Sequence, residues 1–174
     1  MGGIAVGVCL LTSAAAYQYV QPTVGGWQEI AWPFPRDAWP AGRAYRCGAA
    51  TCGDDIELYV RPKIGFCNCD TGVADDDEVD RVADLDLLSE KFVPLEPGKL
   101  VDVADMAGRS RNYDLRMFDG SRRLAVGIAA SRRCDLMVAV AVGKPAASDV
   151  ARKALDFLGS NAMAGWMVAS MTGR

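Results

Sequence analysis

Residues 112–142 constrain the fold most, because two turn signals separate three apolar runs there. Asp119-Gly120 is typical of two-residue hairpin loops, and the polar residues 131–135 mark a second turn. Folding the chain about both turns predicts three antiparallel strands that share one apolar face. The side chains on that face are Tyr113, Leu115, Leu124, Val126, Ile128, Val138, Val140 and Val142. Both turns place the same face of the middle strand inward, which predicts an antiparallel meander.

Segments before the meander predict further strands. Residues 42–47, 54–60 and 99–104 are short strand candidates, and in the second of these Ile56, Leu58 and Val60 alternate with polar residues. The tryptophan- and proline-rich residues 27–40 predict an extended lead-in whose aromatic side chains fold onto the domain, because proline fixes φ and removes a backbone donor. An aromatic binding surface is the alternative interpretation of this lead-in.

Three helices are predicted. Asp75 and Glu78 have the spacing of a capping box at a helix start. An apolar stripe then predicts a helix that continues to the neighbourhood of Phe92. The stripe consists of Val79, Val82, Leu85 and Leu88. The second helix is predicted over 149–158, with Gly159 after its end, and the third over 161–170.

The predicted fold class is therefore α+β, with an antiparallel sheet of about five or six strands and two or three helices packed on one face. We expect a single domain over residues 17–174, because the length is that of about one domain.

The first 28 residues contain no charged side chain. An apolar run over residues 4–11 precedes the small residues 12–16, a pattern typical of a secretory signal peptide cleaved after Ala16. Residues 1–16 are therefore predicted to direct export, so that the mature chain is periplasmic or secreted. The alternative is an uncleaved N-terminal anchor that faces the periplasm. Association with a membrane is expected only in that second case.

Export predicts that the cysteines are paired, because thiols tend to oxidise outside the cytoplasm. Removing Cys9 with the signal leaves five cysteines. We predict a Cys47–Cys52 disulfide, and a second disulfide that joins Cys134 to either Cys67 or Cys69. The remaining cysteine is then free. A zinc site built from the first four of these residues is a weaker alternative, because the Cys67-x-Cys69 spacing is too short for the usual zinc turn.

The absence of histidine excludes serine–histidine and cysteine–histidine nucleophile pairs within this chain, and histidine metal ligands. No phosphate loop, nucleophile elbow or dinucleotide fingerprint is present. A net charge of −3 gives no reason to expect nucleic-acid binding. These observations favour a non-catalytic protein without a cofactor.

Charge is segregated between two segments. Residues 70–90 hold nine acids and one base, and residues 109–133 hold seven arginines and two acids. One interpretation is that the two segments lie side by side and pair. The acidic segment also suggests a divalent-cation site, although its spacing does not match an EF-hand loop. The candidate ligands are Asp70, Asp75, Asp76, Asp77, Glu78 and Asp80.

The arginine-rich segment suggests a surface for an anionic partner. Arg132 and Arg133 lie at a predicted hairpin tip, where they are most accessible, and Trp166 is a further partner-binding candidate. The sequence therefore predicts an exported, disulfide-containing, non-catalytic protein that binds a protein partner or serves as an accessory protein in a bacterial-type cell envelope. The alternative is a thiol-redox protein that uses Cys67 and Cys69.

Overall fold

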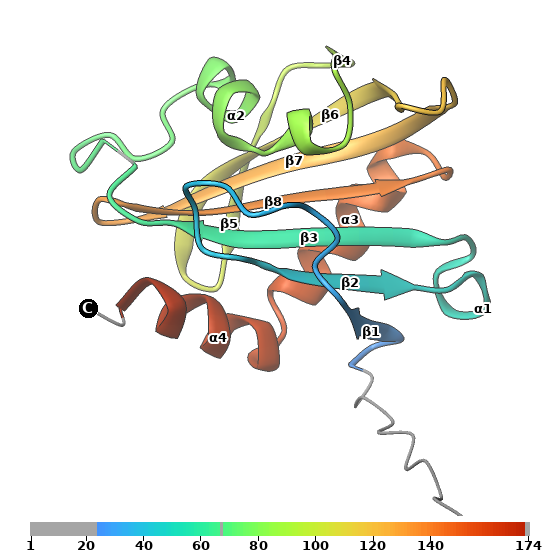
Figure 1. Ribbon diagram of the computed structural model, residues 1–174. Helices are drawn as coiled ribbons and strands as arrows, with labels where there is room; N and C mark the ends of the chain where they lie inside the picture. Colours follow the sequence, from blue (N-terminus) through green and yellow to red (C-terminus); the bar gives the residue numbers. More distant parts are fainter. Residues whose placement is uncertain (1–23, 67, 173–174) are drawn as a thin grey trace, which may run out of the picture.

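The computed structural model describes residues 24–66 and 68–172. The predicted signal segment and Cys67 therefore lie outside the described residues. Within the described part, one antiparallel sheet of eight strands forms the centre of the molecule (Figure 1). In spatial order the strands are β1 (Trp27–Ile30), β2 (Arg43–Cys47), β3 (Ile56–Lys63), β8 (Asp135–Gly143), β7 (Arg122–Arg132), β6 (Met106–Arg116) and β4 (Lys91–Pro94), with β5 (Lys99–Val103) also paired to β6.

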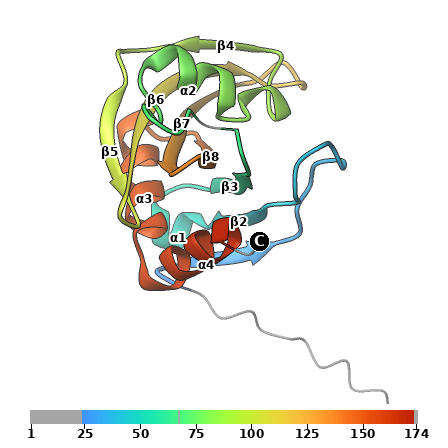
Figure 2. The same ribbon diagram turned by 90° about the vertical axis from the view of Figure 1, so that its left-hand side faces the viewer.

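Helices cover both faces of this sheet (Figure 2). Helices α3 (Ala147–Leu158) and α4 (Asn161–Thr172) pack on one face, and α2 (Asp76–Val82) with the 3₁₀ turn η1 (Leu85–Leu87) packs on the other. A one-turn helix, α1 (Ala49–Cys52), lies in the connection between β2 and β3. Two apolar clusters result, one on each side of the same strands. None of the described helices is long and apolar enough to cross a membrane.

The α+β class is confirmed, but two details of the prediction are wrong: the sheet has more than six strands, and the helices do not share one face. The additional strands include β1 and β4, which both lie at the edges of the sheet. Residues 27–30 form β1 within the predicted lead-in, and residues 91–94 form β4 where the sequence predicted the end of a helix.

The capping box at α2 is confirmed in part. The Asp75 side chain accepts a hydrogen bond from the Glu78 backbone N–H at 2.9 Å, while the Glu78 carboxylate accepts from the N–H of Ala74 at 3.2 Å. The helix ends at Val82, ten residues earlier than predicted, because Asp84 adopts the left-handed conformation with φ of 59°. Leu85 and Leu88 are nevertheless buried, since the η1 turn returns the apolar stripe to the sheet.

Both hairpins of the meander are present, but the register predicted from the shared apolar face, which pairs Tyr113 with Val126 and Val126 with Val140, is wrong by one residue in each. Tyr113 lies opposite Ala125, and Val126 lies opposite Ala141. The first connection is a five-residue turn closed by the Met117 N–H and the Ser121 carbonyl, and the second is a two-residue turn between Arg132 and Asp135.

Because of this shift, apolar side chains of the middle strand, β7, lie on the opposite side of the sheet from Tyr113 and Leu115, with which they were predicted to share a face. Val126 and Ile128 pack in the cluster under α3 and α4, whereas Tyr113 and Leu115 pack under α2. Both faces of the sheet are buried, so either register buries the same apolar residues. The alternation of the sequence therefore could not distinguish them.

Candidate functional site

Two disulfides fasten the connections of the sheet. Cys47 and Cys52 join the end of β2 to α1, with their Cα atoms 5.9 Å apart, which confirms the first predicted bridge. Cys134 is bonded to Cys69, one of the two partners predicted for it, across a sequence separation of 65. Because the sulfur of Cys69 is bonded to Cys134, this structure does not contain the Cys67–Cys69 pair that a redox function would use.

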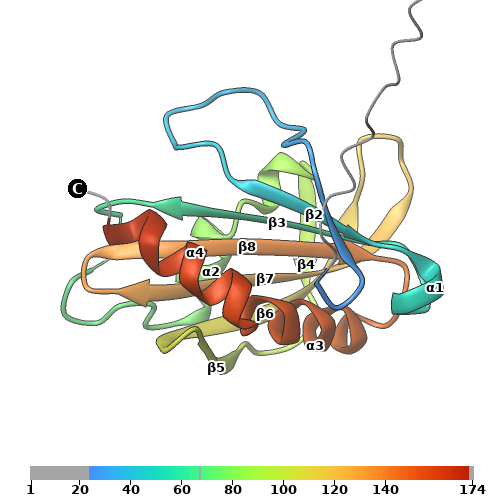
Figure 3. The same ribbon diagram turned by 90° about the horizontal axis from the view of Figure 1, so that it is seen from below.

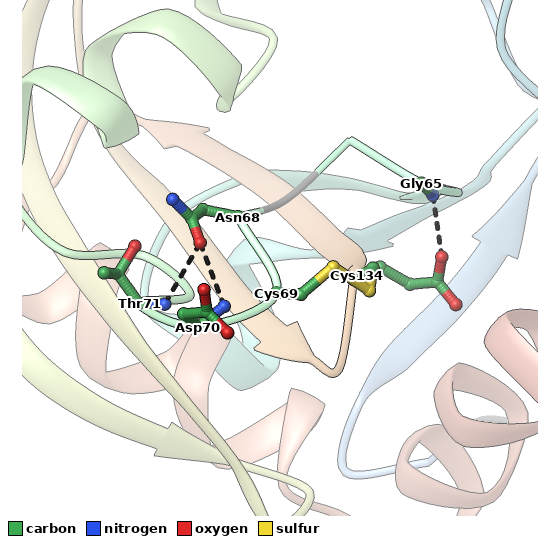
Figure 4. The surroundings of a disulfide bond; sticks show 7 residues. Gly65, Asn68, Cys69, Asp70, Thr71 and Cys134 are labelled. Atoms are coloured by element: carbon green, nitrogen blue, oxygen red, sulfur yellow. Dashed lines mark hydrogen bonds between the residues drawn. A yellow bond between two sulfur atoms is a disulfide. The ribbon is translucent and has the colours of Figure 1, made fainter.

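The second disulfide attaches the turn at residues 68–72 to the hairpin between β7 and β8 (Figure 4). In this turn the Asn68 side-chain oxygen accepts hydrogen bonds from the backbone N–H groups of Asp70 and Thr71, at 2.9 and 3.3 Å. Gly72, with φ of 60°, closes the turn by donating to the Asn68 carbonyl at 2.9 Å. A Cβ at Gly72 would lie 2.4 Å from the Ser131 hydroxyl, so glycine permits this close approach.

Residues 132–135, named here the hairpin tip, are fixed from a second side as well. The Gly65 N–H donates to the Asp135 carboxylate at 2.7 Å (Figure 4). Arg133 stands in the left-handed region with φ of 57°, a conformation that an arginine seldom adopts. The disulfide and the Gly65 hydrogen bond therefore hold a turn that arginine alone does not favour.

Arg132 and Arg133 are both exposed at this tip. Neither forms a salt bridge within residues 24–66 and 68–172, unlike Arg109, Arg111 and Arg122 of the same segment. The two arginines line a cavity of about 430 Å³ together with Gly65, Cys134, Asp135 and the last residues of α4, Met171 and Thr172. Two guanidinium groups and one carboxylate, that of Asp135, leave this lining net positive beside an apolar methionine, which suits an anionic ligand.

Trp166 does not join this cavity. It lies earlier in α4, half-buried, with the Arg43 guanidinium 4.8 Å from its ring centroid. The three residues predicted to bind a partner therefore separate into the arginine pair at the hairpin tip and a tryptophan that packs against β2.

The six candidate cation ligands are dispersed. Asp75 caps α2, Asp76 accepts from Arg109 at 2.7 Å, and Asp80 accepts from Arg111 at 2.8 Å. Glu78 contacts Arg81 at 3.3 Å, whereas Asp70 and Asp77 are exposed. In the described part of the chain, no group of three or more Asp, Glu or Cys side chains is arranged to hold a metal ion. The acidic and arginine-rich segments pair with each other, as one interpretation of the sequence expected.

These interactions also shift the pKa values of the side chains that form them. The backbone N–H of Gly98 and the guanidinium of Arg109 hold the pKa of Asp76 below its usual value. Burial raises the pKa of the Tyr113 hydroxyl, and its hydrogen bond to Asp80 raises that pKa further. Tyr113 is thus a neutral donor that anchors α2 to β6.

No local sequence pattern indicates the buried ionic cluster at the end of β3. The Arg61 guanidinium donates to both oxygens of Asp84 at 2.6 and 2.8 Å, and to Asp37 at 2.7 Å. Lys63 reaches Asp84 at 2.7 Å and the Val82 carbonyl at 2.9 Å. The side chains of Arg61 and Lys63 are only 4% and 7% exposed. Strand β2 pairs with β3 only as far as Val60, which leaves this end of β3 to face the loop at residues 31–42.

Acid is expected to loosen that loop. The hydrogen bond from Arg61 holds the pKa of Asp37 below its usual value, so the interaction stabilises the folded state at neutral pH and is lost as pH falls through that lowered pKa. We expect a change in the fluorescence of Trp32 and Trp39 below roughly pH 4. The Asp37→Asn variant should lack this transition; an identical acid titration in the variant would contradict the prediction.

Comparison with known proteins identifies no family. No protein-family model matches the chain, and no curated protein sequence matches it. Among solved structures, the fold is similar to the crystal structure of a protein of unknown function from Pseudomonas aeruginosa, with a TM-score of 0.43 and 14% sequence identity. The match covers 85% of this chain and 96% of the other. At that level the likeness assigns neither family nor function.

Proposed function

We propose that the chain is an exported, non-catalytic binding protein of a bacterial-type cell envelope, and that the hairpin tip binds an acidic segment of a protein partner. The observation that carries the proposal is the pair Arg132 and Arg133, exposed and without salt bridges in the described part of the chain, on a turn fixed by the Cys69–Cys134 disulfide. A fixed turn loses little conformational freedom on binding, which favours affinity.

The compartment is argued from the disulfides. Two disulfides point to a non-cytoplasmic location, because reducing conditions keep cytoplasmic thiols unpaired. Cleavage after Ala16 remains our proposal for how the chain arrives there. N-terminal sequencing of protein from its native host should find Tyr17 as the first residue; recovery of intact Met1 in the cytoplasmic fraction would contradict export.

Reversing the charge at the tip is expected to weaken acidic-peptide binding. Arg132→Glu/Arg133→Glu should weaken binding of a fluorescein-labelled glutamate-rich peptide by at least about tenfold, because two exposed ion pairs worth up to about 1 kcal/mol each are lost and replaced by like-charge repulsion. Fluorescence anisotropy at low salt measures the effect.

The matched control is Arg116→Glu/Lys144→Glu, which makes the same change in net charge. Both control residues are exposed: Arg116 is the last residue of β6 and Lys144 follows β8, at the end of these strands opposite the hairpin tip. Affinity should stay within about twofold of the parent protein, because neither residue lies at the tip. Equal losses in the two double variants would show that only net charge matters and would refute the tip as the binding site.

A further inference from the structure

The loop at residues 31–42 carries a second cavity, separate from the hairpin tip. The loop extends from the sheet between β1 and β2 (Figure 3). Trp32 and Phe34 pack edge-on against Tyr59, with ring centroids 6.2 and 4.8 Å away, and Trp39 packs edge-on against Phe66 at 5.0 Å. Prolines at several positions restrict the backbone further, so the loop is built to keep one shape.

Asp37 fixes the middle of the loop. One of its carboxylate oxygens accepts from the Trp39 backbone N–H at 2.8 Å, and the other accepts from Arg61 at 2.7 Å. Asp37 therefore attaches the loop to the Arg61 guanidinium. Loop residues and Arg61 together line a space.

That space is a cavity of about 230 Å³, named here the loop cavity. Trp32, Phe34 and Trp39 supply aromatic walls, and Arg36, Asp37 and Arg61 supply its charges. Two positive charges and one negative charge leave the lining net positive. The cavity is more than ten times larger than the roughly 10–15 Å³ that a single bridging water needs, so one trapped water does not account for it.

The hydrogen bonds of Arg61 indicate what the loop cavity accepts. A guanidinium has five N–H groups. Two donate to Asp84 and one to Asp37, and the remaining two, one on each terminal nitrogen, have no acceptor among the described residues. Arg61 also lines the loop cavity, and its side chain is only 4% exposed, so an anionic acceptor placed there can add charge-assisted hydrogen bonds to those that it already forms.

We propose that the loop cavity binds a small organic anion: a carboxylate carried on a flat aromatic body. A carboxylate offers acceptors to the free N–H groups of Arg61 and a counter-charge to Arg36. A flat ring fits the aromatic walls through stacked or edge-on contacts. This proposal concerns a different site from the hairpin tip, and either can fail without the other.

Benzoate is the probe, with benzamide as its neutral analogue and acetate as the analogue without a ring. Isothermal titration of the full chain should show benzoate binding at millimolar concentration, and binding at least about tenfold weaker for each analogue, because each lacks one of the two recognised features. Equal affinity for benzamide would overturn the proposal, as would no binding of benzoate.

Variants test whether benzoate binds in the loop cavity. Arg36→Glu should weaken benzoate binding by at least about tenfold, whereas Arg116→Glu, an equal charge change far along the sheet, should leave it unchanged. Arg132→Glu/Arg133→Glu should also leave it unchanged. Arg61→Lys keeps the buried charge but removes the fork, and should lose benzoate binding while circular dichroism shows that it still folds. If Arg116→Glu weakens binding as much as Arg36→Glu, the interaction is unspecific and the loop cavity is not the site.

Discussion

Replacing Cys69 and Cys134 together by serine is expected to lower the free energy of unfolding by about 4 kcal/mol, measured by urea denaturation. The bridge closes a loop with a sequence separation of 65, so its loss restores a large conformational freedom to the unfolded chain. It also releases the 68–72 turn from the hairpin tip. Acidic-peptide binding should then weaken as well, since the tip loses its fixed shape.

The matched variant replaces Cys47 and Cys52 by serine. This bridge has a sequence separation of 5, and the same chain-entropy relation gives a loss of about 2 kcal/mol. Removing both cysteines of a pair avoids new free thiols in either case. Equal losses for the two pairs would show that loop closure is not the main contribution of the long bridge.

Asp84→Ala is expected to reduce the free energy of unfolding by about 3–5 kcal/mol, because it removes the shared partner of two buried cations. Arg61 would keep only Asp37, whose side chain is 36% exposed, and Lys63 would keep only the Val82 carbonyl and aromatic contacts. Urea denaturation measures the loss.

Two controls separate charge from backbone conformation. Asp84→Asn keeps a residue type that tolerates the left-handed conformation, so a similar loss assigns the effect to the missing charge. Arg152→Ala breaks an exposed pair, with side chains 61% and 51% exposed, and should cost less than about 1 kcal/mol. A small loss in Asp84→Ala would mean that the cluster adapts, for example by admitting water.

The hairpin tip and the Arg61 cluster differ in how far apart along the chain their residues lie, which explains why only the hairpin tip was predicted. Arg132 and Arg133 were predicted as an accessible pair because a local turn signal places them at a hairpin tip. The Arg61 cluster joins residues 37, 61, 63 and 84, which no local pattern relates. At its centre, the left-handed conformation of Asp84 ends α2 early. The apolar stripe continues past this residue, so its spacing still predicts one continuous helix.

The sequence by itself determined the features that depend on neighbours along the chain. These are the α+β class, the two hairpins, the Asp75 cap and the Cys47–Cys52 bridge. It also narrowed the partner of Cys134 to two residues, since few cysteines remained to pair with it. Local turn chemistry, helix capping and short loops act over a few residues, so the pattern of residue types is enough to predict them.

Tertiary structure decided the rest, because those features depend on what packs across the sheet. Both faces of the meander are apolar, so only the lengths of the turns at 117–121 and 133–134 fixed which face of β7 meets which helix. The pairing of Asp76 and Asp80 with Arg109 and Arg111 likewise required α2 to lie over β6. A buried charge or a strand register is selected by contacts between distant segments, and those contacts exist only once the sheet has formed.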